Sequence, residues 1–244
     1  MLAKRIFDFV ISLIFLVLCS PLFLIIGLLI KATSPGPVFF PAKRMEINRR
    51  NGDRRKNINN YENERRNGDQ RKTDLHGKLF YMLKFRTMIH GAENNGPSVT
   101  SKADPRITKI GAVLRKTKLD ELPSLLNVLK GEMSLVGPRP ETPDWIKYYS
   151  QKEKEILKTK PGITGNAQIK YRNEEELLDG DSLKSDYLKI MRDKLAIDLY
   201  YKQNWTFIRD VIIIVKTVFI LFSPLKEARA KVLLNLRMLI SNLW

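Results

Sequence analysis

The segment Leu119–Pro123 reads "LDELP" and places two carboxylates side by side in a strongly basic chain. Asp120 suits the N-cap of a helix over "ELPSLLNVLKG", and Pro123 then lies in the first turn, where a missing N–H is harmless. The unpaired N–H groups of a helix N-terminus attract phosphate. A carboxylate there could attack phosphorus or bind Mg²⁺, and two acids could divide these tasks. Helix capping alone would explain Asp120 but not Glu121.

Several cationic residues could serve the same chemistry. In "GPRP" (137–140), the two prolines hold Arg139 on a stiff turn that suits bidentate phosphate binding, although an ordinary tight connection has the same sequence. The loop "KPGITG" (160–165) could bring backbone N–H groups close to an anion. Lys84 and Arg86 in "KFRTM" could face a phosphate or simply face water.

Composition narrows the class of partner. The 244 residues include 43 Lys and Arg against 26 Asp and Glu, a net charge of +17. Such a surplus predicts an anionic partner: nucleic acid, a phosphorylated substrate or an acidic membrane surface. The single Cys19 excludes an internal disulfide and fits a reducing compartment. Neither His76 nor His90 lies in a zinc-binding motif.

The N-terminal part contains 22 consecutive uncharged residues from Phe9 to Ile30. A straight helix of this length would measure about 33 Å, enough to cross a hydrocarbon core. The run is too long for the apolar part of a cleaved signal peptide, and no cleavage site follows it. A buried core helix is the alternative that involves no membrane.

A bent helix that enters and leaves the membrane by the same face fits this run better than a straight crossing. Basic residues flank both ends, and positive charge tends to stay on the cytoplasmic side. Pro21 lies near the middle and must kink the helix, while the Ser20 hydroxyl can hydrogen-bond the disturbed backbone. A single span with a tolerated kink remains the alternative.

The C-terminal part predicts a second membrane contact. Residues 205–222 are apolar but interrupted by Arg209, Asp210 and Lys216, and the segment after Pro224 mixes basic with apolar residues. This composition suits helices that lie in the headgroup plane. A helix buried in the core of the domain is the alternative for Phe207–Phe222.

Between these regions the sequence predicts an α+β domain. An extended segment follows Lys31, and the alternation in Gly77–Met88 favours a strand. Residues 111–129 look helical with a break at "LDELP", and a polar helix is expected from Thr142 to Lys158. The basic tract between the first two extended segments contains a near-repeat, "RRNGDRRK" and "RRNGDQRK", and is too polar to form a core. A solvated loop is the simplest interpretation of this tract, and contact with acidic lipid or RNA is the other.

Four motifs, in this order along the chain, resemble the bacterial sugar transferase family, the monotopic polyprenol-phosphate phosphoglycosyl transferases. They are Ser20-Pro21 within the apolar run, "GKLFYMLKFRTM", "DPRITKIGAVLRKTKLDELPSLLNVLKGEMSLVGPRP" and "KPGITGNAQ". The resemblance runs from about Lys4 to Phe222 and omits the basic tract. The block from Asp104 to Pro140 is too specific to be a chance similarity.

The resemblance implies a reaction, a cofactor and a location. Members of the family transfer a hexose 1-phosphate from a UDP-sugar to polyprenol (undecaprenyl) phosphate, release UMP and so initiate the synthesis of a surface glycan such as exopolysaccharide, O-antigen or capsule. The implied cofactor is Mg²⁺, and the implied location is the cytoplasmic face of the bacterial inner membrane. The match of Ser20 and Pro21 to the family's helix break favours the same-face topology.

The resemblance also assigns roles to residues. Asp120 corresponds to the nucleophile that forms a phosphosugar-aspartate, and Glu121 to its partner; both are expected to bind Mg²⁺. Lys84, Arg115 and Arg139 correspond to cations near the phosphates. Further substrate-binding candidates are Thr164, Gly165 and Gln168. The sequence leaves open which sugar is transferred, the glycan pathway and whether the chain forms a homodimer.

The implied organisation has three parts. A re-entrant helix-break-helix occupies residues 1–33, a small mixed cytosolic catalytic domain 34–204 and interfacial amphipathic helices 205–244. The basic flexible insertion at 45–75 departs from the family, in which a short loop joins these segments, and Asn166 stands where an apolar residue is common.

Two other functions are compatible with part of the sequence. A membrane-tethered nucleic-acid-binding protein would use the Arg-rich repeat, but Tyr61 is the aromatic residue available within it, so base stacking is not indicated and no nucleic acid is expected as a partner. A catalytically inactive scaffold would not need the acidic pair and its cations.

Overall fold

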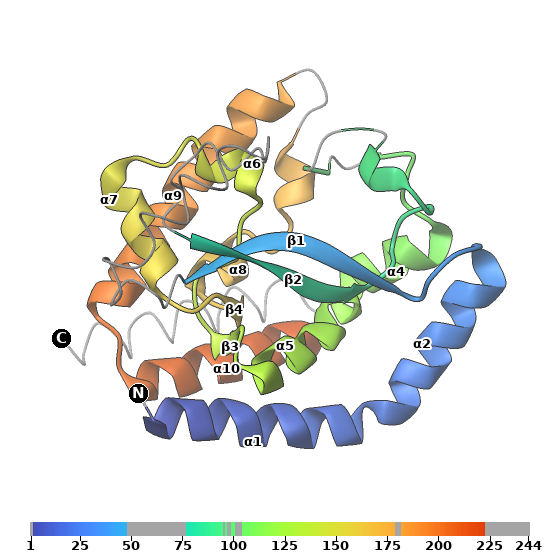
Figure 1. Ribbon diagram of the computed structural model, residues 1–244, viewed down its shortest axis with the longest axis horizontal. Coiled ribbons are helices and arrows are strands. Elements are labelled where there is room, and N and C mark those ends of the chain that lie inside the picture. The colour runs from blue at the N-terminus through green and yellow to red at the C-terminus, as the bar shows by residue number, and fades with distance from the viewer. Residues whose placement is uncertain are drawn as a thin grey trace, which may run out of the picture.

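The computed structural model describes residues 2–47, 77–94, 96, 99–100, 104–178 and 182–222 (Figure 1). Helices dominate this part of the chain. The α-helices are α1 (Leu2–Leu18), α2 (Ser20–Thr33), α4 (Lys109–Thr117), α5 (Leu125–Lys130), α6 (Pro143–Ile146), α7 (Gln151–Lys154), α8 (Asn166–Lys170), α9 (Leu183–Gln203) and α10 (Phe207–Phe222). The 3₁₀ helices are η1 (Ala92–Asn94), η2 (Leu119–Ser124), η3 (Glu155–Lys158) and η4 (Glu174–Leu177).

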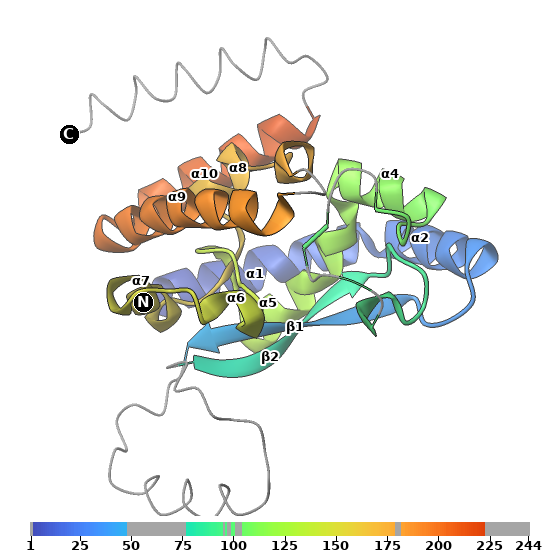
Figure 2. The same ribbon diagram turned by 90° about the horizontal axis from the view of Figure 1, so that it is seen from above.

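Two small sheets accompany the helices. Strands β1 (Phe39–Ile47) and β2 (Gly77–Phe85) pair antiparallel, from Phe39 opposite Phe85 to Ile47 opposite Gly77. Strands β3 (Ser134–Val136) and β4 (Gly162–Thr164) pair in parallel. In Figure 2 the β1–β2 ribbon and the α9–α10 pair lie on opposite sides of the described chain. The mixture of helices with two short sheets confirms the α+β class.

Strand β2 follows the expected alternation along most of its length. Phe80 and Met82 are buried in the core, whereas Leu79 and Tyr81 between them are exposed. Strand β1 extends through Met45 to Ile47, into the segment expected to be the basic insertion. The two near-repeats of that insertion lie outside the described residues.

The polar helix expected from Thr142 to Lys158 is wrong in its continuity, because it divides into α6, α7 and η3. The cause is a capping box at Ser150. The Glu153 carboxylate accepts the Ser150 N–H at 2.6 Å, and the Ser150 hydroxyl oxygen accepts the Glu153 N–H at 3.3 Å. This reciprocal pair satisfies the donors of a new helix start.

The apolar run forms α1 and α2, which meet at Cys19 with a bend of 60°. Pro21 lies in the first turn of α2, and the Ser20 hydroxyl donates to the Val17 carbonyl at 2.8 Å. These contacts confirm the predicted kink. No single described helix has the length and hydropathy to cross a membrane, but this bent pair meets both criteria together.

Helix α1 buries polar residues and exposes most of its apolar ones. Its buried residues are Asp8 and Ser12, and the Asp8 carboxylate accepts the Ser134 hydroxyl at 2.7 Å and the Leu135 N–H at 3.3 Å. Its large apolar side chains are mostly exposed: Leu2, Ile6, Phe9, Val10, Leu13, Ile14, Phe15, Val17 and Leu18. A soluble helix would bury such residues, so this surface needs an apolar partner.

Both ends of the helix pair are fastened to the same folded domain. Near the start of α1, Lys4 donates to the Val136 carbonyl at 3.1 Å and pairs with Asp210 of α10. After α2, the Ser34 and Pro35 carbonyls accept hydrogen bonds from Arg86, which is buried. The sequence suggested that Arg86 would face a phosphate or water. The structure shows instead that Arg86 holds the end of α2.

Helix α10 is intermediate between a core helix and a lipid-facing helix. It buries Asp210, Ile213 and Ile220 against the domain, and Tyr201 donates to Asp210 at 2.6 Å. Its other side exposes Phe207, Ile208, Val211, Val215, Val218, Phe219 and Leu221. The mixed segment predicted to follow α10 lies outside the described residues.

Candidate active site

The acidic pair lies in η2, between α4 and α5, and packs against β2. Ser124 at the end of η2 donates its hydroxyl proton to the Leu83 carbonyl at 2.8 Å. Asn127 in α5 accepts the Leu83 N–H at 2.9 Å and donates to the Tyr81 carbonyl at 2.8 Å. These bonds replace the neighbour that β2 lacks on this edge and fix η2 in place.

The predicted helix cap at Asp120 is wrong. Helix α5 begins only at Leu125, and Asp120 lies inside a 3₁₀ turn that starts after Lys118. The turn is tighter than an α-helix, and it directs Asp120 inward, where 7% of the residue is exposed. Capping therefore no longer accounts for this carboxylate.

Glu121 is clamped by two cations. Its Oε1 accepts Lys84 Nζ at 2.7 Å and Arg139 Nη2 at 2.8 Å, and its Oε2 lies 3.5 Å from Arg139 Nη1. Burial opposes ionisation of Glu121, but Arg139 and Lys84 outweigh it and hold the pKa of Glu121 well below its usual range. The Glu121 charge in turn raises the pKa of Arg139, whereas burial lowers that of Lys84. The structure thus brings together the predicted Glu121, Lys84 and Arg139.

Asp120 differs from its neighbour. Burial raises the pKa of Asp120, against the attraction of Lys84, and the Glu121 charge raises it further. Its Oδ1 is buried and has no hydrogen-bond partner among the described residues. Glu121 is therefore paired with two cations, while Asp120 has an oxygen without a hydrogen-bond partner among the described residues.

Arg115 is positioned by α4. Thr108 caps this helix by accepting the Gly111 N–H at 3.0 Å, and a Cβ on Gly111 would lie 1.9 Å from the Thr87 carbonyl oxygen, so only glycine allows this approach. Arg115 pairs with Glu175 of η4 through Nη2. Its Nε is buried without a described partner.

The "KPGITG" loop joins the "GPRP" turn through the β3–β4 pair. The Gly137 N–H donates to the Thr164 carbonyl at 3.0 Å, and Gln168 Nε2 donates to the Gly137 carbonyl at 3.2 Å. A Cβ on Gly162 would lie 2.1 Å from Gly137 N, so glycine is required at this crossing. Gly165 begins α8, and the Thr164 hydroxyl bonds to that of Thr217 at 2.7 Å. These predicted residues are placed beside the turn that carries Arg139.

Unsatisfied polar atoms concentrate in this region. Among the described residues, five buried side-chain polar atoms have no hydrogen-bond partner, and three of them belong to Asp120, Arg115 and Gln168. Buried polar groups are normally paired, because leaving one unpaired costs about 1–3 kcal/mol. Their concentration at predicted site residues supports a polar ligand there.

The acidic pair can be tested for its fit to Mg²⁺. No group of three or more metal-ligating side chains occurs among the described residues. Mg²⁺ is commonly held by one or two carboxylates together with substrate phosphates. Asp120, with its unpartnered Oδ1, fits that pattern, whereas the Glu121 oxygens are already engaged by Lys84 and Arg139.

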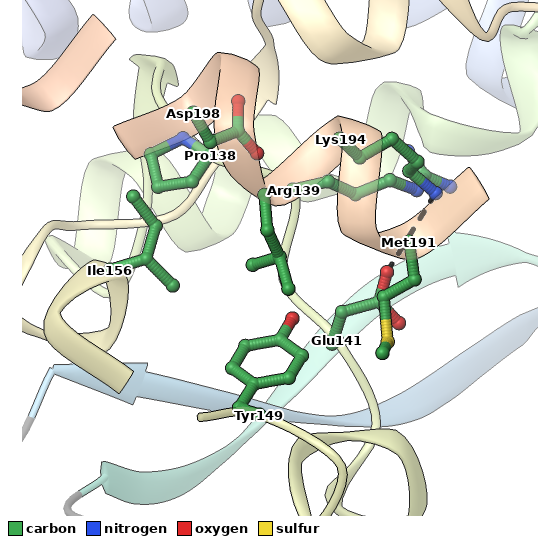
Figure 3. Close-up of a pocket in the computed structure, with 9 residues that line it drawn as sticks. Pro138, Arg139, Glu141, Tyr149, Ile156, Met191, Lys194 and Asp198 are labelled. Atoms are coloured by element: carbon green, nitrogen blue, oxygen red, sulfur yellow. Dashed lines mark ion pairs between the residues drawn. The ribbon is translucent and has the colours of Figure 1, made fainter. Parts of the chain in front are cut away.

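A small cavity lies behind the "GPRP" turn (Figure 3). Asp198 and Lys194 of α9 face Pro138, Arg139 and Glu141 across it. Asp198 is buried and accepts the backbone N–H of Arg139, and burial raises the pKa of Asp198 to about 7. This carboxyl therefore holds the backbone of the turn that carries Arg139.

Sequence reasoning missed several of these residues. Lys118 stands two residues before Asp120 in "KLDELP", which was a visible signal. Glu175 and Asp198 carry no local signal, because each is brought to the site by a segment distant in sequence. Asn127 is close in sequence, but its partners in β2 are not.

The sequence of this chain was compared with those of known proteins and protein families. A sequence model of the family described as "Bacterial sugar transferase" matches residues 1–57 and 62–224. The chain is 35% identical over 232 residues to "Exopolysaccharide production protein ExoY" of Rhizobium meliloti (strain 1021), covering 89% of this chain and 84% of that protein.

Two further relatives carry names that describe a reaction. "UDP-glucose:undecaprenyl-phosphate glucose-1-phosphate transferase" of Caulobacter vibrioides is 36% identical over 222 residues, 89% of this chain and 68% of that protein. "Undecaprenyl-phosphate galactose phosphotransferase" of Salmonella typhimurium is 35% identical over 230 residues, 88% of this chain and 39% of that longer protein. With the family match over most of its length, the chain belongs to the bacterial sugar transferase family.

Proposed function

We propose that this protein transfers a hexose 1-phosphate from a UDP-sugar to polyprenol phosphate through a phosphosugar-aspartate, and so begins the synthesis of a surface glycan. The observation that carries the proposal is that the two adjacent carboxylates have different surroundings. Glu121 is neutralised by Lys84 and Arg139, whereas Asp120 keeps a buried oxygen without a partner. The printed names of the Caulobacter and Salmonella relatives support this class of reaction.

In the first step, an Asp120 oxygen bonds to the sugar-linked phosphorus, and the bond from that phosphorus to the bridging oxygen breaks. UMP leaves with the bridging oxygen and the electron pair. In the second step, an oxygen of polyprenol phosphate attacks the same phosphorus and the bond to Asp120 breaks. Covalent catalysis divides the transfer in two, so the soluble and the lipid substrate need not be bound together.

The side chains of the site make approach of an anionic nucleophile to a diphosphate feasible. Arg139 and Lys84 supply fixed positive charge at Glu121, and Arg115 interacts electrostatically with Asp120. Such preorganised charges stabilise phosphoryl transfer most effectively in a site that excludes water. Mg²⁺, if held by Asp120 together with the substrate phosphates, would neutralise further charge on the diphosphate, while Glu121 stays engaged by Lys84 and Arg139.

The surface supports a monotopic attachment with the catalytic domain on the cytoplasmic face. The apolar sides of α1 and α10 are exposed, and both ends of the α1–α2 pair bind one domain. A straight crossing would separate those ends by the thickness of the bilayer. A re-entrant pair keeps them together and places the acidic pair at a height where a lipid phosphate can reach it.

The reaction is tested with membranes that contain the protein, Mg²⁺, undecaprenyl phosphate and a panel of UDP-sugars, with UMP release as the signal. Asp120→Asn should abolish release, while Asp193→Asn, an exposed carboxylate of α9, should retain it. With donor alone, mass spectrometry should find a phosphosugar on the peptide that contains Asp120. Sustained turnover by Asp120→Asn would refute the assigned nucleophile.

The topology is tested by cysteine labelling in a Cys19→Ser background. Leu2→Cys and Ala32→Cys place thiols at exposed positions on the two flanks of the helix pair. We expect an impermeant reagent to label both from the cytoplasmic side of inverted vesicles. Labelling from opposite sides would exclude the re-entrant arrangement.

A nucleic-acid-binding function receives no support from these comparisons, and the Arg-rich repeat that would carry it lies outside the described residues. A deletion that tests it must start after Ile47, because Met45 is buried in β1. Ile47 and Gly77 are paired in the β1–β2 ladder, so a short Asn-Gly turn can join them. UMP release should largely survive this deletion.

A further inference from the structure

Lys118, the residue before "LDELP", has an unusual backbone. Its φ of 61° lies in the left-handed region, and no other described residue except glycines has a positive φ. It ends α4 at a position where glycine or asparagine is preferred, since a side chain there costs on the order of 1 kcal/mol. Strained residues of this kind concentrate at functional sites.

The Lys118 ammonium is also a cation close to the acidic pair that is not held by a carboxylate among the described residues. Lys84 and Arg139 are paired with Glu121, and Arg115 with Glu175. Within the described part of the chain, the Lys118 side chain has no hydrogen bond or ion pair, although it interacts electrostatically with both acids of the pair, with Arg139 and with Glu175. It is half-buried, and burial together with repulsion from Arg139 lowers its pKa.

We propose that Lys118 is a substrate-binding residue whose ammonium donates to a phosphate oxygen of the substrates beside Asp120. The inference rests on the proposed function, because only a phosphate ligand of the acidic pair would need this cation. Lys84, Arg139 and Arg115 are each paired with a carboxylate before substrate arrives. The Lys118 ammonium can therefore donate to a phosphate oxygen without first breaking an ion pair.

The phosphate could belong to either substrate. In a reaction with a covalent intermediate, the phosphate of polyprenol phosphate takes the place that the UMP phosphate has left. One ammonium beside Asp120 could therefore serve the donor, the acceptor or both in turn.

The test uses Lys118→Asn, because asparagine tolerates the left-handed backbone and removes the charge. The matched control is Lys116→Asn, which removes the same charge from an exposed position of α4. Circular dichroism and membrane association should be unchanged in both variants. Binding of UDP to the purified full-length protein is measured by calorimetry, and KM values are measured for the UDP-sugar and for undecaprenyl phosphate.

We expect Lys118→Asn to weaken UDP binding or to raise the KM for undecaprenyl phosphate by roughly ten- to a hundredfold, the loss of one charged hydrogen bond. Weakened UDP binding assigns the contact to the donor, a raised acceptor KM alone assigns it to polyprenol phosphate, and both effects assign it to a shared position. Lys118→Arg should restore most of the loss.

Unchanged values for both substrates, or equal changes in Lys116→Asn, would overturn the inference. If the unmodified protein neither binds UDP nor releases UMP from any UDP-sugar, the proposed function itself fails and the inference fails with it.

Discussion

Asp198 offers a quantitative test of how α9 supports the turn that carries Arg139. This carboxyl of α9 is 5% exposed. It lines a small cavity with Arg139 of the "GPRP" turn, the following Glu141, Tyr149 and Lys194. Burial raises its pKa to about 7; the Arg139 N–H and Lys194 oppose that rise, and Glu141 adds to it. The folded protein therefore binds a proton at Asp198 in a pH range where the unfolded chain does not.

The sign and size of the effect follow from linkage. An acid whose pKa is raised on folding destabilises the folded state as pH rises from its unfolded value of about 3.9 towards its folded value. With a folded pKa of about 7, the penalty grows by roughly 2.5 kcal/mol between pH 5 and pH 7.5, at 1.36 kcal/mol per unit. Asp198→Asn cannot ionise, so it should escape this penalty while still accepting the Arg139 N–H through its amide oxygen.

The measurement is urea unfolding in detergent, followed by tryptophan fluorescence at several pH values in the two proteins. The free energy of unfolding of Asp198→Asn minus that of the original protein should increase by about 2–3 kcal/mol from pH 5 to pH 7.5. Asp193→Asn, on the same helix, is the flat control: hydrogen bonds from Lys170 and Tyr171 lower the pKa of Asp193, so this carboxyl is ionised in both the folded and the unfolded chain throughout this pH range. A difference for Asp198→Asn that stays flat over this range would refute the reasoning.

Two further substitutions probe the acidic pair and its support. Glu121→Gln should reduce the rate of UMP release about a hundred- to a thousandfold in a kinetic assay, because Lys84 and Arg139 lose the charge that positions them; an unaltered rate would contradict this role. Asn127→Ala should lower the free energy of unfolding by about 3 kcal/mol, because it removes the bonds to Leu83 N and the Tyr81 carbonyl in a buried site. Calorimetric melting would show no shift if those groups found other partners.

The sequence predicted the parts of the site that depend on short motifs. "LDELP", "GPRP" and "KPGITG" each contain Pro or Gly at positions that determine a turn. In the structure Arg139 of "GPRP" binds Glu121 of "LDELP", and "KPGITG" packs against the "GPRP" turn. The family resemblance is confirmed by the match over most of the chain. The roles of Asp120 as nucleophile and of Mg²⁺ remain predictions.

What the sequence could not predict depends on contacts between distant segments. Arg86 reads like a surface cation in "KFRTM", but the carbonyls it binds belong to residues about fifty positions earlier. The capping role expected of Asp120 failed because Ser124 and Asn127 fix η2 on β2, and a tight turn replaces the first turn of the helix. Local propensity gives no information on such anchoring.

The buried polar residues of α1 link the proposed membrane attachment to the proposed chemistry. The buried Asp8 binds Ser134 and Leu135 of β3, and the chain leaves β3 directly into the turn that carries Arg139. Helix α1, with its exposed apolar side, and the turn that carries Arg139 therefore share one short strand. Because a three-residue strand has little freedom, the depth of α1 in the bilayer would also determine the height of Arg139 and its partner Glu121. A soluble nucleotide sugar and a lipid phosphate can meet at one aspartate only if that height is fixed, which gives a physical reason for a charged residue on the inner face of an otherwise apolar helix.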